Sequence, residues 1–350
     1  IGLCVIYRML NRYKKAEETM AVLLTLSKRL KDSMTEIAVL KSLANLYWAK
    51  SDFKSAEDVF DRIFTNFSDY KNNLDFAKIY SDASQVALLN NDVPKALDYI
   101  NSGEKIAEQF NDRRTIAYIL SSRAGMYQYL GDYKKAISFY EKSLEVNRER
   151  NERLHDLYNL ISIILNYCRI GDCIAAQKTL EKVEPLISQK DTPQAFFDYI
   201  MVKVDIEIAE RKFHHAEQYL KEALKMAQGS NQIFQTMIVY YRMSDYYSKT
   251  DNITEALKCL RKSLKIAQDR GYESFLVEEG RFDLSQIKFA LENDLSVDYL
   301  SHILLSIDNE EAKRLSRKLN IKHGTYDLSC QFFGNFQLKD NSGQIFTPHW

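Results

Sequence analysis

The sequence has few of the residues that interrupt helices and no long hydrophobic run. It contains 4 prolines and 11 glycines among 350 residues, and no apolar stretch approaches the roughly 18 residues that a membrane span requires. Its 48 basic and 48 acidic residues cancel, so no net field draws a nucleic acid or a membrane surface to the chain as a whole. We therefore expect a mostly helical protein with no membrane partner.

Neither the cysteines nor the common catalytic motifs indicate a disulfide framework, a metal site or an active site. The five cysteines show no CxxC pair and no framework spacing, which favours buried reduced thiols and a cytoplasmic location. The motifs GxxxxGK[ST], HExxH, GxSxG and GxGxxG are absent. His214 and His215 form the only histidine pair, but no cysteine or paired carboxylate lies nearby, so a solvated turn is favoured over a metal site. We expect no enzymatic activity, no cofactor and no metal.

A repeat of 40 residues dominates the sequence and occurs seven times without an insertion or deletion. An alanine fixes its register, with an apolar and mostly aromatic residue three positions earlier and a larger, mostly apolar residue four positions later. The alanines are Ala16, Ala56, Ala96, Ala136, Ala176, Ala216 and Ala256. A period of this length indicates stacked supersecondary units, because one unit cannot bury its own apolar face.

One repeat shows what the unit is. Between Ile116 and Leu130, apolar residues recur at spacings of three and four, which predicts an amphipathic helix. Gly131 tolerates the turn that ends this helix, and a second helix carries Ala136. So short a connection makes the two helices pack antiparallel. We expect the alanine to lie where helices cross closely, so that a larger side chain overpacks.

These residues resemble the tetratricopeptide repeat. Six of them fall at the offsets typical of that family: Ala124, Tyr127, Gly131, Tyr133, Ala136 and Tyr140. The usual repeat has about 34 residues, and the longer form here is similar to that of bacterial regulators and some scaffolding proteins. Repeats three and six depart from the pattern, with Ala87 and Glu207 in place of the tyrosine. The resemblance implies an all-α, right-handed solenoid of helical hairpins over residues 1–271, whose concave groove binds partners.

The pattern fades after residue 271. Residues 272–322 predict closing helices and a linker, with one long helix over 272–291 and shorter ones over 297–307 and 310–319. The long helix has Phe275, Leu276, Phe282, Ile287 and Leu291 as its apolar face. Residues 323–350 bring alternation, glycines and aromatics, which predict strands near 326–333, 335–339 and 344–346.

Two segments in this region resemble a second family, the large bacterial transcriptional activators. Residues 290–294 with 297–300 resemble the end of their helical sensor, and residues 328–336 with 343–345 and Trp350 resemble the opening strands of their winged helix. The resemblance implies a truncated winged-helix domain, with DNA bound only through domains beyond residue 350. Ile1 already lies in register within a first helix, so we expect the chain to be part of a longer protein.

The first resemblance also implies which residues line the groove. Those positions hold Lys41, Asn45, Trp48, Lys78, Asp82, Gln85, Tyr118, Ser122, Gln128, Tyr158, Ser162, Asp205, Tyr241, Arg242 and Asp245. Lys41 and Asn45 match members that grip a chaperone tail, but Asp82 would repel its terminal carboxylate, which argues against that ligand. Such a mixed surface suits a peptide, a protein segment or a small polar effector.

Two functions remain open from the sequence. The first is a ligand- or partner-binding sensor and coupling array of a bacterial transcriptional regulator. The second is a cytosolic scaffold that assembles proteins through its groove, with the C-terminal strands as its own cap. A gene that continues past Trp350 into a recognition helix and a hairpin wing would favour the first.

Overall fold

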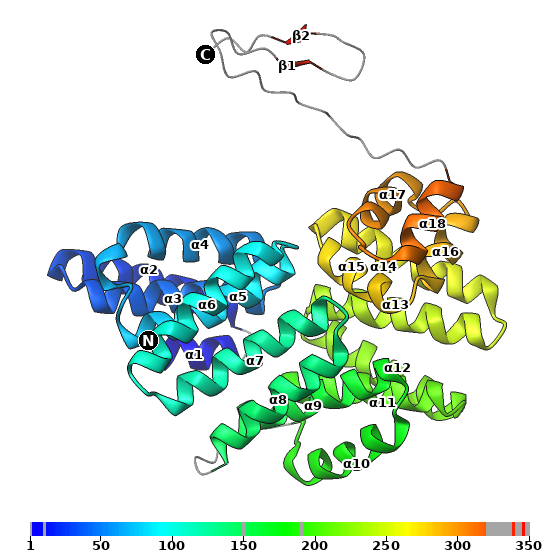
Figure 1. Cartoon of the computed structure of the whole chain (residues 1–350), viewed down its shortest axis with the longest axis horizontal. Coiled ribbons are helices and arrows are strands. Elements are labelled where there is room, and N and C mark those ends of the chain that lie inside the picture. Colours follow the sequence, from blue (N-terminus) through cyan, green and yellow to red (C-terminus); the bar gives the residue numbers. More distant parts are fainter. Residues whose placement is uncertain are drawn as a thin grey trace.

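The structure is a computed structural model that describes residues 2–9, 12–148, 152–189 and 192–319, together with the strand residues 338–339 and 345–346. Up to residue 319 the described chain is an all-α solenoid, and its first fourteen α-helices form seven consecutive hairpins (Figure 1). The hairpins are α1 Gly2–Met9 with α2 Tyr13–Leu30, α3 Ser33–Ala49 with α4 Phe53–Asn66, α5 Leu74–Leu89 with α6 Val93–Gln109, α7 Arg113–Tyr129 with α8 Tyr133–Asn147, α9 Arg153–Ile170 with α10 Cys173–Val183, α11 Pro193–Ala209 with α12 Phe213–Gly229, and α13 Ile233–Lys249 with α14 Ile253–Arg270.

Short 3-10 helices follow α4 and α10, at Ser68–Tyr70 and Glu184–Leu186. Four further helices close the array and are called the closing helices below. They are α15 Glu273–Phe282, α16 Ser285–Glu292, α17 Val297–Leu305 and α18 Glu310–Lys318. Among the described helices, none is both long enough and apolar enough to cross a membrane.

The turns inside the six hairpins from α3 to α14 share one backbone conformation. At 40-residue intervals one residue adopts a left-handed φ between 57° and 83°: Ser51, Asn91, Gly131, Gly171, Arg211 and Asp251. The next residue is usually an aspartate or asparagine whose side chain accepts a hydrogen bond from the N–H three residues on, which caps the second helix. Glycine suits a left-handed residue best, but small polar and even long side chains are accepted here. The missing glycines therefore leave the hairpins intact.

The register alanines lie where the sequence places the closest helix packing. All seven have no exposed surface. Their neighbours Phe60, Ile100 and Leu220, one turn further along the second helices, are also buried. Small residues at these points let neighbouring helices approach closely.

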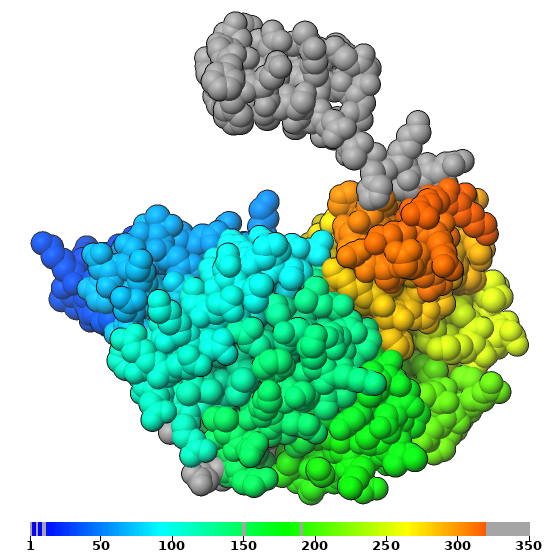
Figure 2. Space-filling model, viewed as in Figure 1, coloured from blue at the N-terminus to red at the C-terminus, as the bar shows by residue number. Residues whose placement is uncertain are grey.

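The solenoid winds far enough for its late repeats to touch its early ones, and we call this contact the join (Figure 1). Phe53 at the start of α4 packs its ring 5.3 Å from that of Phe234 on α13. The Gln232 amide donates to the Tyr13 hydroxyl at 2.6 Å, and the Ser274 hydroxyl donates to the Leu89 carbonyl at 2.6 Å. In Figure 2 the cyan surface near α5 and α6 abuts the orange surface of the closing helices. Residues about 185 positions apart therefore share one hydrophobic core.

The prediction of one helix over 272–291 is wrong. The chain breaks at Asp283, whose backbone is extended, and α16 starts afresh at Ser285. The Asp283 carboxylate accepts from both the N–H and the hydroxyl of Ser285 at 2.8 Å, which favours a new helix start over continuation. Phe282, expected on the apolar face, is 41% exposed, whereas Leu276 and Ile287 are buried. The break turns α16 away from α15 and opens a corner between them.

Most of the predicted C-terminal β segment lies outside the described residues, including the expected strand over 326–333. The two described pieces are β1 Leu338–Lys339 and β2 Ile345–Phe346. They pair antiparallel, with Leu338 opposite Phe346 and Lys339 opposite Ile345. A winged-helix start at this end of the chain stays a prediction.

Replacing Ala136 with leucine should lower the free energy of unfolding by about 1–3 kcal/mol, because the added methyl groups have no space between the crossing helices. The same change at exposed Ala21 should alter it by less than about 0.5 kcal/mol. Urea midpoints followed by circular dichroism measure both. Equal midpoints would show that the alanine register does not mark the tight crossing.

Replacing Phe53 with alanine should loosen the join at a distance in sequence. Its ring also lies 5.6 Å from that of Tyr272, so its loss should speed amide hydrogen exchange in the first turns of α13 and α15. Phe64 is the matched control, since it stacks on Tyr80 and contacts only early repeats. Phe64→Ala should speed exchange in α4 to α6 alone. Unchanged exchange in α13 and α15 of Phe53→Ala would show that the join does not depend on this ring.

Candidate functional site

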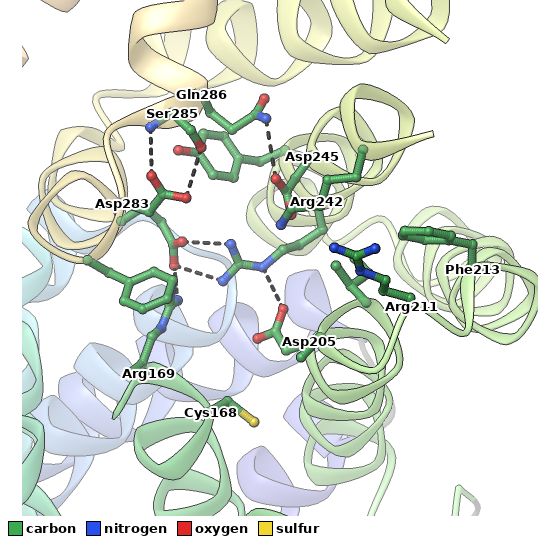
Figure 3. A pocket seen from close by; sticks show the side chains of 16 residues that line it. Cys168, Arg169, Asp205, Arg211, Phe213, Arg242, Asp245, Asp283, Ser285 and Gln286 are labelled. Carbon is green, nitrogen blue, oxygen red and sulfur yellow. Dashed lines mark hydrogen bonds and ion pairs between the residues drawn. The ribbon is translucent and has the colours of Figure 1, made fainter. Parts of the chain in front are cut away.

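A pocket of about 540 Å³ lies where the solenoid meets the closing helices (Figure 3). One wall comes from the first helices of three successive repeats, α9, α11 and α13. The opposite wall comes from the end of α15 and the start of α16, the corner created by the break at Asp283. The volume falls within the range of pockets that bind small molecules or short peptides.

Two arginines from the repeats and a glutamate from α15 meet in this pocket, and we call Arg169 and Arg242 the arginine pair. The Arg242 guanidinium donates two hydrogen bonds to the Glu279 carboxylate, Nη1 to Oε2 at 2.6 Å and Nη2 to Oε1 at 2.9 Å. Arg169 donates from Nη2 to Oε1 at 2.5 Å. Asp205 is a second partner of Arg242, 3.3 Å from its Nε. This fork geometry is the one that arginine uses to recognise carboxylates.

Burial and charge act in opposite directions in this network. The side chains of Arg169 and Glu279 are each 7% exposed. Burial alone would raise the pKa of Glu279, but the two arginines outweigh it and lower that pKa to about 2. Burial raises the pKa of Asp205 despite its arginine neighbours. Glu279 is therefore the principal counter-ion of the arginine pair and is charged at neutral pH.

Other groups on the pocket wall are satisfied locally, with one exception. The Lys249 ammonium donates to Asp245 at 2.7 Å, and Asp283 accepts from Ser285. Burial raises the pKa of the Cys168 thiol to about 12, so this cysteine is not a thiolate nucleophile. Arg211 lies on the left-handed turn before α12, is exposed, and has no acidic partner within the described part of the chain.

The structure brings four of the predicted groove residues into this pocket: Asp205, Tyr241, Arg242 and Asp245. Tyr241 is only 2% exposed and packs edge-on against Phe275 of α15, so it belongs to the core more than to an open surface. Gln128 lies outside the pocket but also meets α15, since its amide donates to Glu278 at 3.1 Å. The closing helix therefore covers part of the expected groove.

The remaining groove residues lie elsewhere along the array and outside this pocket. Asp82 is engaged by both residues that suggested a carboxylate clamp, at 3.4 Å from the Lys41 ammonium and 3.4 Å from the Asn45 amide. Trp48 is 42% exposed, Tyr118 lies beside His155 with ring centroids 4.2 Å apart, and Lys78, Gln85, Tyr158 and Ser162 are half-buried. These residues do not form one site.

Ser122 was expected to face the groove, and this is wrong. It is 3% exposed, and its hydroxyl lies 2.8 Å from that of Ser81 on α5. The two serines are one repeat apart and fill the contact between neighbouring first helices. A small polar side chain fits such a contact because its partner in the next repeat satisfies its hydrogen bond.

Sequence reasoning missed Arg169 and Glu279. Arg169 lies next to Cys168 near the end of α9, and Glu279 lies beyond the last repeat, where no periodic register applies. The available signal was Arg242, a groove position whose charge requires a counter-ion. His214 and His215 lie in the first turn of α12, where they contact Gln218 and Glu207, and no metal-binding cluster occurs in the described residues.

Comparison with models of known protein families assigns this chain to one of them. The family model named MalT-like TPR region matches residues 1–293. The chain belongs to the MalT-like TPR region family. Its repeats are thus tetratricopeptide repeats (TPR), and the match extends past them through α15 and α16. A comparison with curated protein sequences gave no match.

Solved structures share the fold of this TPR region at low sequence identity. A Rap protein complexed with Competence and Sporulation Factor is 13% identical, with 90% of this chain and 87% of that chain covered and a TM-score of 0.63. NprR in complex with its cognate peptide NprX is 18% identical, with 91% and 95% covered and a TM-score of 0.58. The apo quorum sensor NprR of B. thuringiensis is 16% identical, with 91% and 87% covered and a TM-score of 0.53. These likenesses show the fold.

The pH dependence of stability should reveal the charge on Glu279. Its pKa is lower in the folded than in the unfolded chain, so its stabilising contribution is complete above about pH 4.5 and is lost as pH falls toward 2. Glu279→Gln should therefore cost roughly 3 kcal/mol near neutral pH and progressively less in acid. Urea denaturation at a series of pH values measures the difference.

Glu278 supplies a matched control of opposite sign. Burial raises its pKa and its hydrogen-bond donor is the neutral Gln128, so Glu278→Gln should cost little near neutral pH. A penalty for Glu279→Gln that does not change with pH would contradict the assignment of Glu279 as a charged partner of the arginine pair.

Proposed function

We propose that this TPR region is the ligand-binding sensor and coupling array of a bacterial transcriptional regulator in the cytoplasm. The observation that carries the proposal is the pocket between the repeats and the closing helices. A ligand there touches α9, α11 and α13 on one side and α15 and α16 on the other. Its affinity therefore differs between conformations in which the two walls stand in different positions. Such a difference in affinity is the condition for a ligand to shift a conformational equilibrium.

The closing helices are suited to carry such a change. They follow the last repeat and lead toward residues 323–350, the segment that resembles the start of a winged helix. Their contacts with the repeats are mostly polar at the pocket and apolar at the join, so the pocket end is held by exchangeable interactions. DNA binding itself would reside in domains beyond residue 350.

The comparisons support a peptide or a small polar effector as the ligand. The Rap protein and NprR structures of the same fold are complexes with a factor and with a cognate peptide. In this chain the pocket combines charged groups of both signs with Tyr241, Phe213 and Phe282, a composition that suits a polar ligand with an apolar part.

A cytosolic scaffold for protein–protein interaction is the second candidate. The observation in its favour is the set of exposed hydrophobic side chains on the early repeats, among them Trp48, Val22 and Leu26. A partner captured there would bind without any contribution from the pocket. A gene that continues past Trp350 into a recognition helix and a hairpin wing would support the sensor. A gene that encodes neither would support the scaffold.

A pocket-filling substitution tests the sensor proposal. Ala209, the last residue of α11, is exposed and lines the pocket, so Ala209→Trp should fill it while leaving the helix intact. Tripeptides and small polar metabolites that raise the thermal midpoint of the wild-type chain should lose at least tenfold in affinity for this variant. Ala21→Trp on the exposed face of α2 is the matched control.

Two results would count against the sensor proposal. One is a set of ligands whose affinity is unchanged by Ala209→Trp, since they bind elsewhere. The other is a protein partner whose capture is abolished by Trp48→Ala and unaffected by Ala209→Trp, which would support the scaffold.

A further inference from the structure

The arginine pair is a carboxylate receptor assembled from the repeats alone. Arg169 belongs to α9 and Arg242 to α13, two helices of the solenoid, and both side chains reach into the pocket (Figure 3). The three short hydrogen bonds they form all go to one carboxylate, that of Glu279. That carboxylate comes from the closing helix α15, so these hydrogen bonds join the repeats to the closing helices.

Without Glu279, the buried guanidinium groups of Arg169 and Arg242 would lose the carboxylate that accepts their hydrogen bonds and balances their charge. Arginine stays charged under all physiological conditions, so a buried arginine without an acceptor is costly. Asp205 lies 3.3 Å from the Nε of Arg242 and attracts Arg169 only from a longer distance, so it does not replace the hydrogen bonds that Glu279 accepts from both arginines. When α15 moves away, the lowest-cost replacement for Glu279 is another carboxylate.

The other charges on the pocket wall agree with this. The lining residues include four cations and four carboxylates: Arg169, Arg211, Arg242 and Lys249 against Asp205, Asp245, Glu279 and Asp283. If Glu279 leaves, the balance is restored only by an anionic ligand. Arg211, exposed at the edge of the pocket and without an acidic partner in the described residues, offers a third guanidinium to such a ligand.

Resting on the function proposed above, we propose that the pocket takes a carboxylate-bearing ligand, a small organic acid or the C-terminus of a short peptide, and that Glu279 occupies its place beforehand. The ligand carboxylate binds the arginine pair and displaces Glu279. No covalent bond forms or breaks.

Displacement of Glu279 would also weaken the contacts of α15 with the early repeats, because the same helix makes both. On the same helix the Arg281 guanidinium donates to the Tyr129 carbonyl at 2.8 Å, and the Ser274 hydroxyl donates to the Leu89 carbonyl. A ligand that releases Glu279 therefore loosens the element that connects the pocket, the early repeats and the C-terminal segment. In the ligand-free protein Glu279 competes with the ligand for the arginine pair, and this competition lowers the apparent affinity of the ligand.

Succinate binding to three folded proteins tests the proposal: the wild type, Glu279→Gln and Glu278→Gln. Succinate carries two carboxylates, and its neutral diamide at matched ionic strength is the control ligand. Because glutamine is a weaker competitor for the arginine pair, Glu279→Gln should bind succinate at least tenfold more tightly than the wild type. Glu278→Gln should match the wild type, since Glu278 contacts Gln128 and forms no hydrogen bond to the arginine pair. The diamide should bind none of them.

Equal succinate affinities for all three proteins, or no succinate binding to folded Glu279→Gln, would overturn the proposal. If Glu279→Gln does not fold by circular dichroism, hydrogen exchange of the wild type decides. Saturating succinate should speed exchange in α15 at least tenfold, and unchanged exchange would overturn the proposal. Ligands that bind in the pocket, lose affinity in Ala209→Trp and show no preference for a carboxylate would leave the sensor function standing while removing this inference.

Discussion

The close helix crossings at the seven register alanines determine the rest of the structure. Each alanine is fully buried, so neighbouring helices can pack closely in all seven hairpins. The stacked hairpins wind far enough for the end of the array to contact its early repeats. A larger side chain at these positions would overpack the helix contacts on which the stacking of the hairpins depends.

The join makes this array different from an open solenoid. In an open array each repeat contacts only its neighbours, and stability is a sum of local terms. Here Tyr13 contacts Gln232 of the last repeat, and Leu89 contacts Ser274 of the closing helix α15, so the two ends of the array stabilise one another. Part of the concave surface is thus used by the protein itself. Asp82 neutralises Lys41, Ser122 pairs with Ser81, and Gln128 binds Glu278, which leaves the pocket beside α15 as the place where groove residues converge.

The buried network of the arginine pair, Glu279 and Asp205 connects α15 to the repeats with defined chemistry but adds little net stability. Desolvating two arginines and two carboxylates costs about as much as their attraction returns, and apolar residues of the same size could hold α15 as well. What apolar residues could not provide is an exchangeable contact with a defined chemistry. Arg242 holds Glu279 by two parallel hydrogen bonds, a geometry that selects for carboxylates over other groups.

The sequence by itself determined the 40-residue repeat and the all-α solenoid of helical hairpins. This succeeded because both rest on local periodicity, the alanine every 40 residues and the spacing of apolar residues within a repeat. The resemblance to tetratricopeptide repeats implied a groove that includes Asp205, Tyr241, Arg242 and Asp245, and these four line the pocket.

Only the tertiary structure decided what those residues meet. Arg169 and Glu279 are 110 positions apart and no period relates them, because Glu279 lies outside the repeats. The break at Asp283, which opens the pocket, depends on side-chain hydrogen bonds to Ser285 within a run whose apolar spacing suits one continuous helix. The burial of Ser122 depends on Ser81 in the preceding repeat. Local patterns indicate where helices form and how they pair, but the stacking of the whole array decides which distant residues come to face one another.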